Sequence, residues 1–235
     1  MEETVVISGN DITEIIDEAK KSTNKKLIIG PGIIKQRDSF FATKCGVLKF
    51  RENPPVFWID YHQKRYIPVR GERIVGIVVQ KGGMSVKVDI GTNENAVLSL
   101  LAFEGATKRN KPIIQVGDLV FAQVLGVNQN SETELVCVTS KGKRNGMGVL
   151  PAEGFMIDVP INVCRRLLAP ECRLLKNLGT KFKYEIAIGM NGRIWVRATS
   201  HQATTFICNT LAEIEYLNDD EIQKRTDSIL DEFVV

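Results

Sequence analysis

Gly189-Met190-Asn191-Gly192 runs directly into Arg193-Ile194-Trp195-Val196, and this stretch decides how we interpret the C-terminal part of the chain. The Gly-Met-Asn-Gly part stands between two runs with a strong strand preference, residues 182–188 and 194–197. Glycine and asparagine tolerate positive φ angles, so the stretch predicts a hairpin turn. Such turns occur in many β-containing folds, and the meaning of this one depends on the strands upstream.

Even spacing of strand signals marks the middle of the chain. Gly82-Gly83, Gly91-Thr92-Asn93 and two longer loops separate these signals, and no helix-length pattern interrupts them. This pattern within residues 66–140 predicts a closed five-stranded barrel of the OB type. The expected strands are residues 73–80, 84–90, 96–100, 118–127 and 134–140.

Residues 141–235 predict a small α+β domain in the order helix, strand, strand, helix, helix. Residues 162–168 have helical spacing with Asn162 as the expected cap, and they end before a proline. The two strands around the Gly-Met-Asn-Gly turn follow. Residues 204–216 and 221–230 have the pattern of amphipathic helices.

The N-terminal part predicts a small β domain at residues 27–65, preceded by a tail at residues 1–26. A domain of fewer than forty residues has only a small hydrophobic core, so we expect it to be stabilised by contact with a neighbour. It would serve either as an assembly surface or as an extension of the barrel. A short helix starting near Asp11 is marginal by itself, so the tail is expected to be disordered or docked. The fold class is therefore multidomain, β plus α+β.

Composition narrows the class of protein. The chain has 235 residues and a net charge of +3, so the placement of its basic residues matters more than their total. Its five cysteines form no CxxC pair, which argues against a disulfide framework or a zinc site and favours a reducing compartment. No apolar run approaches the about 20 residues that span a bilayer, so we expect a soluble intracellular protein.

Several motifs together resemble one known family. Gly117-Asp118-Leu119-Val120-Phe121-Ala122, followed by the Gly-x-Asn-Gly-x-Ile-Trp-Val stretch at residues 189–196, is similar to the S1/KH cap subunits of the eukaryotic RNA exosome. Shorter motifs elsewhere in the chain are also similar to this family, among them Met156-Ile157-Asp158-Val159 and Ala187-Ile188-Gly189. The resemblance covers residues 27–230 and leaves out the tail.

The resemblance implies an N-terminal β domain, an S1 barrel and a KH domain. It implies a non-catalytic subunit, without cofactor or metal, that sits with two other cap subunits on a ring of RNase PH-like proteins in the nucleus, the nucleolus and the cytoplasm. RNA would thread past it toward a separate 3′→5′ exonuclease. The turn would be a packing element between S1 and KH, formed by Gly189, Asn191 and Gly192 with Trp195 at the junction.

The barrel is the expected RNA surface, because OB-type barrels bind single strands through aromatic stacking and backbone cations. The usual aromatic positions hold Met84 and Val86, so we expect weak binding with little sequence preference. Phosphate contacts are expected from the loop before Pro112 and, less strongly, from the end of the first barrel strand. The residues in question are Lys108, Arg109, Lys111 and Lys81.

Catalytic residues are not expected. His62 and His201 stand in no metal or nucleophile pattern, and Asp60 and Asp158 look isolated. The acidic run at residues 219–221 fits the start of a helix better than a magnesium site. Two other functions remain open on the residues alone, a free-standing S1/KH regulator of translation or transcription and, with less support, a nuclease.

Overall fold

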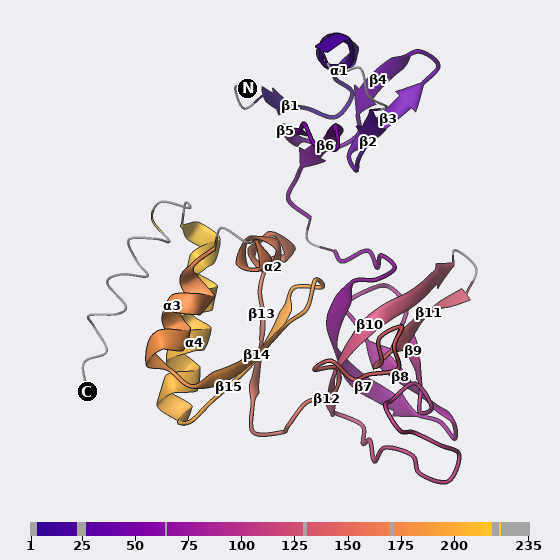
Figure 1. Cartoon of the computed structure of the whole chain (residues 1–235), viewed down its shortest axis with the longest axis vertical. Coiled ribbons are helices and arrows are strands. Elements are labelled where there is room, and N and C mark those ends of the chain that lie inside the picture. The colour runs from indigo at the N-terminus through magenta and orange to yellow at the C-terminus, as the bar shows by residue number, and fades with distance from the viewer. Residues whose placement is uncertain are drawn as a thin grey trace. The chain divides into compact units, whose positions relative to one another are not determined.

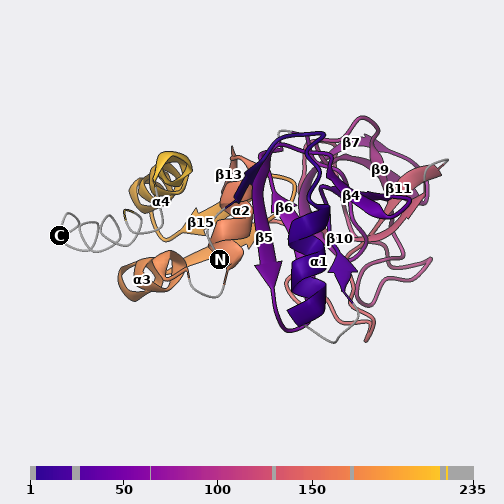
Figure 2. The same ribbon diagram turned by 90° about the horizontal axis from the view of Figure 1, so that it is seen from above.

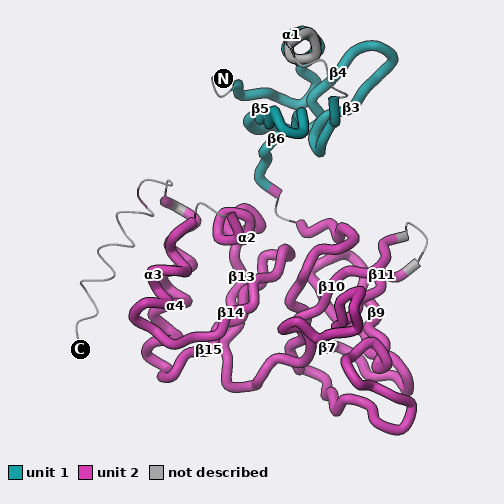
Figure 3. The backbone as a smooth tube through the Cα atoms, in the orientation of Figure 1, with its two compact units in different colours: residues 1–62 teal, residues 63–235 magenta. Residues whose placement is uncertain are grey.

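The computed structural model describes residues 4–22, 27–63, 65–128, 131–169, 172–217 and 221. It divides into two compact units, residues 1–62 and 63–235 (Figure 3). The helix expected at residues 221–230 lies outside the described residues except for Glu221. None of the described helices is long and apolar enough to cross a membrane.

The first unit is a four-stranded sheet with a helix and a hairpin against one face. The sheet has the order β1-β5-β6-β2, formed by β1 (Thr4–Val6), β5 (Gly46–Arg51), β6 (Val56–Asp60) and β2 (Ile28–Ile29). β3 (Ile33–Gln36) and β4 (Ser39–Ala42) make the hairpin, and α1 (Thr13–Ser22) is the helix.

Residues 4–22 contribute a strand and a helix to this unit, which agrees with the docked alternative for the expected tail and not with the disordered one. Ile12 and Ile16 lie one helical turn apart and are 2% and 0% exposed, so both belong to the core of the unit. The Thr13 hydroxyl also accepts a hydrogen bond from the Phe40 amide at 2.8 Å, which fastens the helix start to β4. A helix that is marginal alone is stable here because tertiary packing holds it.

The second unit begins with a closed five-stranded barrel, as the sequence predicted (Figure 1). Its sheet order is β11-β9-β8-β7-β10, and β10 pairs again with β11 to close it. The strands are β7 (Arg73–Lys81), β8 (Ser85–Asp89), β9 (Ala96–Ser99), β10 (Leu119–Asn128) and β11 (Ser131–Val136). The short strand β12 (Gly148–Val149) pairs antiparallel with the start of β10, at Val120 and Phe121.

A KH domain completes the second unit. Its sheet has the order β13-β15-β14, and α3 and α4 lie on the side of the sheet away from the barrel (Figures 1 and 2). The elements are β13 (Phe155–Asp158), α2 (Ile161–Leu168), α3 (Leu174–Lys181), β14 (Tyr184–Ile188), β15 (Arg193–Ala198), α4 (His201–Glu213) and the 3₁₀ turn η1 (Ile214–Tyr216).

The expected order of this domain lacked β13 and α3. The eight residues of α3 include Gly179, which weakens helix propensity, and the burial of Leu174 and Leu178 supports the helix instead. Pro160, not Asn162, occupies the cap position of α2, with φ −58°, ψ 145° and no side-chain cap hydrogen bond. The Asn162 side-chain oxygen is buried without a hydrogen-bond partner.

Candidate nucleic-acid interface and the S1–KH junction

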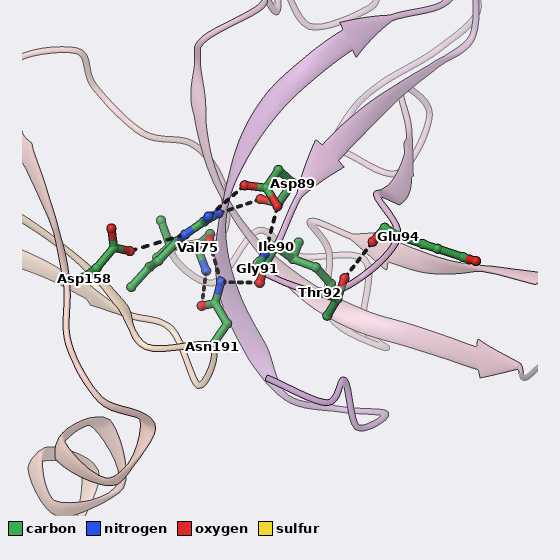
Figure 4. A network of polar contacts seen from close by, with 9 residues as sticks. Val75, Asp89, Ile90, Gly91, Thr92, Glu94, Asp158 and Asn191 are labelled. Atoms are coloured by element: carbon green, nitrogen blue, oxygen red, sulfur yellow. Dashed lines mark hydrogen bonds and ion pairs between the residues drawn. The ribbon is translucent and has the colours of Figure 1, made fainter. Parts of the chain in front are cut away.

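Asn191 joins the turn at residues 189–192 to the barrel. Its side-chain amide donates to the carbonyls of Val75 at 2.8 Å and Ile90 at 3.0 Å, and its side-chain oxygen accepts from the Val75 amide at 3.2 Å (Figure 4). All hydrogen-bonding groups of one side chain therefore satisfy backbone groups of β7 and of the chain just after β8.

Both glycines of this turn are required by their surroundings. Gly192 has φ +85°, and a Cβ there would stand 2.5 Å from the Val159 carbonyl. A Cβ on Gly189 would stand 2.7 Å from the Val75 amide nitrogen. The missing side chain at Gly189 lets the turn approach the barrel, and the one at Gly192 lets it approach the segment just after β13.

Arg193 forms a second link beside Asn191. Its guanidinium donates to the Asp89 carbonyl and to the Asp89 carboxylate, each at 2.7 Å, and lies 3.5 Å from a carboxylate oxygen of Asp158 (Figure 4). Asp158 is therefore ion-paired and not isolated as the sequence suggested; Asp60 is likewise 3.3 Å from the Lys49 ammonium. The Arg193–Asp89 pair was missed in the sequence because its partners are 104 residues apart.

Electrostatics at Asp89 favour its charged form. Burial tends to raise the pKa of this carboxyl, but the hydrogen bond from Arg193, the Gly91 amide and the Arg193 charge together lower it below its usual 3.8. The carboxylate is thus ionised at neutral pH and stays paired with Arg193.

Trp195 packs into the barrel's hydrophobic core although it belongs to the KH sheet. It is 2% exposed and shares a cluster with barrel residues and with Ile161 and Ala187. Gly154 lies against the indole, since a Cβ there would stand 2.1 Å from a ring carbon. The indole N–H is buried without a hydrogen-bond partner, so packing alone holds the ring.

The KH domain of this chain lacks a Gly-x-x-Gly loop between its helices α2 and α3. In RNA-binding KH domains a Gly-x-x-Gly loop grips the backbone of the nucleic acid. The corresponding connection between α2 and α3, residues 169–173, contains no glycine. The Gly-Met-Asn-Gly turn instead joins β14 to β15 and lies against the barrel.

The predicted cations lie at one end of the barrel. Lys108 and Arg109 form the exposed tip of a turn closed by Thr107 and Asn110. The Thr107 amide donates to the Asn110 carbonyl at 2.9 Å, and the Asn110 amide donates to the Thr107 hydroxyl at 3.0 Å. Lys111 is half-buried, and its ammonium lies 3.3 Å from the Gly83 carbonyl, in the turn that follows Lys81. The structure therefore brings Lys81 and Lys111 to neighbouring turns.

The outer face of β8 and β9 binds ligands in many OB folds. In this barrel it lacks the side chains that would bind RNA. The outward residues of these strands are Ser85, Lys87, Asp89, Val97 and Ser99, none of them aromatic. Lys87 is tied to Glu132 at 2.8 Å. This face offers neither a stacking platform nor a free cation.

Buried thiols are kept protonated. Burial raises the pKa of the Cys137 thiol and of the Cys164 thiol to about 12. All five cysteines are free, and no group of three or more His, Cys, Asp or Glu with metal-site geometry occurs among the described residues.

A barrel and a KH domain that share one core define an S1/KH protein. Family models match three parts of the chain: the S1 domain of exosome complex component RRP40 at 66–148, a KH domain at 154–202 and the N-terminal domain of mammalian RRP40 at 4–62. Exosome complex component RRP40 of Drosophila melanogaster is 42% identical over 221 residues, covering 94% of this chain and 93% of that protein. The chain belongs to the family of exosome complex component RRP40.

Further relatives support the same family assignment. The human exosome complex component RRP40 is 42% identical over 208 residues, covering 86% of this chain and 76% of that protein. The Saccharomyces cerevisiae protein is 36% identical over 200 residues, covering 81% and 83%. A crystal structure assigned as an exosome complex RNA-binding protein shares the fold, with a TM-score of 0.60 and 22% identity over 72% of this chain and 96% of that chain.

Proposed function

We propose that the chain is a non-catalytic, RNA-binding cap subunit of the RNA exosome, which stabilises an RNase PH-like ring and lines the path by which RNA enters for 3′→5′ processing and decay. The anchoring of the Gly-Met-Asn-Gly turn by Asn191 carries this proposal. Because the KH turn is used for packing, the domain is a rigid support, and the cationic end of the barrel is left to meet RNA.

Phosphate contact is assigned to Lys108, Arg109, Lys111 and Lys81. Exposed cations add modest affinity each, and that affinity falls steeply with salt. The strand face without aromatics supports weak, sequence-tolerant binding, which suits a subunit past which many RNAs are threaded. A free-standing RNA regulator is not favoured, because the relatives that match over most of their length are exosome components.

The first unit supplies an assembly surface. Alternate strand residues face opposite sides of its sheet, so Val5, Val47, Trp58 and Ile28 share the side opposite α1. Val5 is 72% and Ile28 49% exposed. We assign this outer face to ring subunits, together with a surface of the KH domain, and we place the protein with its complex in the nucleus, the nucleolus and the cytoplasm.

We further assign no bond-making or bond-breaking step to the chain itself. The buried thiols are held protonated, whereas a nucleophilic cysteine needs a lowered pKa. Purified chain incubated with RNA, magnesium and phosphate should leave the RNA intact, and shortening of the RNA would contradict this assignment.

Affinity purification followed by mass spectrometry tests the proposal. The tagged chain should recover RNase PH-like subunits, other cap subunits and a 3′→5′ exonuclease. Trp58→Glu should lower the recovery of ring subunits, whereas Val127→Glu, at a half-exposed barrel position, should not. Recovery of the chain alone, or with ribosomes only, would overturn the proposal.

A further inference from the structure

A second basic loop of the barrel is not used by the function proposed so far. Residues 137–147 connect β11 to β12 and carry Lys141, Lys143 and Arg144, all exposed. A basic run of this kind is by itself an ordinary solvated loop. This loop lies next to another basic segment, however, and two adjacent basic segments can together form a binding surface.

Two hydrogen bonds hold this loop against the segment that leads to Lys108. The Cys137 amide donates to the Ala102 carbonyl at 3.0 Å, and the Arg144 amide donates to the Glu104 carboxylate at 2.8 Å. Lys108 follows Glu104 by only four residues, so their Cα atoms are at most about 14 Å apart. The two basic segments are therefore neighbours on one side of the barrel.

The loop is also internally ordered. The Thr139 amide donates to the Lys143 carbonyl at 2.9 Å, and the Gly142 amide donates to the Thr139 carbonyl at 2.8 Å. The Arg144 side chain donates to the Met147 carbonyl at 2.6 Å. A turn built in this way presents its lysines at fixed backbone positions, which lowers the entropy lost when they contact a ligand.

The lysines of this turn are available to an outside anion. Neither Lys141 nor Lys143 forms an ion pair with any residue that the structure describes. The nearby acid, Glu104, accepts a hydrogen bond from the Arg144 amide and keeps its negative charge, but Lys141, Lys143 and Arg144 outnumber it. This surface is thus cationic, in contrast to the outer face of β8, where Lys87 is neutralised by Glu132.

We propose that the loop at residues 137–147 and the turn at residues 107–110 form one surface that binds the phosphate backbone of single-stranded RNA, with Lys141 and Lys143 as additional contacts. The inference rests on the proposed function and extends it, because it adds two lysines to the four basic side chains already assigned to phosphate contact. Backbone contact of this kind carries no sequence preference.

The salt dependence of RNA binding by the full chain tests this surface. Fluorescence anisotropy with a labelled oligouridylate, from about 50 to about 200 mM salt, gives the slope of log K against log salt. Each lost phosphate contact lowers that slope by about 0.7, so Lys141→Gln/Lys143→Gln should lower it by about 1.4. Wild type should then lose about sevenfold more affinity than the variant over this range.

Matched variants separate the possible causes. Lys176→Gln/Lys181→Gln removes the same charge from exposed positions of α3 and should leave the slope unchanged, and Lys141→Arg/Lys143→Arg should restore it. An unchanged slope in Lys141→Gln/Lys143→Gln, with a lower slope in Lys108→Gln/Arg109→Gln, would overturn this inference and leave the proposed function intact. If neither pair lowers the slope, or wild type binds no RNA at the lowest salt, both fall.

Discussion

At the scale of single residues, Asn191 makes the most specific contacts of the junction. One amide side chain satisfies two carbonyls and one N–H of the barrel backbone. A hydrogen bond gives modest net stability, but removing one partner leaves buried groups unsatisfied at about 1–3 kcal/mol each. The Asn191 side chain therefore contributes more to the stability of the fold than its small size suggests.

Asn191→Ala should lower the free energy of unfolding by about 3 kcal/mol, because three barrel groups lose their partner. Urea unfolding of the purified chain, followed by circular dichroism, measures this change. Asn177→Ala, at a half-buried position of α3, should stay within about 0.5 kcal/mol of wild type. Equal stability of the two variants would show that the turn does not anchor the KH domain.

At the scale of elements, the barrel strand β8 is clamped to the KH strand β15 by the pair of Asp89 and Arg193. Their atoms are 2.7 Å apart, and the Arg193 side chain is 13% exposed. The pKa of Asp89 is lowered in the folded state, so the pair stabilises the fold above the unfolded pKa of 3.8. That contribution is lost as the pH falls through the folded pKa.

The stability difference between wild type and Asp89→Asn should therefore be constant above about pH 5 and shrink below it. Urea unfolding at several pH values from neutral to about pH 3 measures this difference. Glu94→Gln, which removes an exposed carboxylate from the loop after β8, provides the control and should follow wild type at every pH. A difference that grows toward acid pH would contradict the clamp.

At the scale of the whole molecule, the S1 barrel and the KH domain share a hydrophobic core. Trp195, Ala187 and Ile161 come from the KH domain and lie in the same cluster as the barrel residues. The KH domain has a second cluster of its own between its sheet and helices. We therefore expect the barrel to depend on the KH domain for part of its stability.

Trp195→Ala should destabilise the second unit by about 3–5 kcal/mol, because a large buried side chain leaves a cavity. Hydrogen exchange measured by mass spectrometry should show lost protection in β7 and β10 as well as in β15. Phe155→Ala, whose ring is 60% exposed, should change protection little. Loss confined to the KH strands would mean that the two domains unfold independently.

The sequence by itself determined the barrel and the turn, because strand alternation and turn chemistry are local properties. Four barrel strands and the two strands around the Asn-Gly turn lie within two residues of their predicted bounds, whereas the fifth, predicted at residues 134–140, lies at Ser131–Val136. The helix α1 could not be placed in a domain from its sequence, since only packing against the strands of the first unit buries Ile16 and the preceding Ile12 in a core. Only the tertiary structure brought Asp89 to Arg193 and residues 137–147 to residues 101–106. These contacts join residues far apart in the chain, and no local pattern encodes which distant group will be the partner.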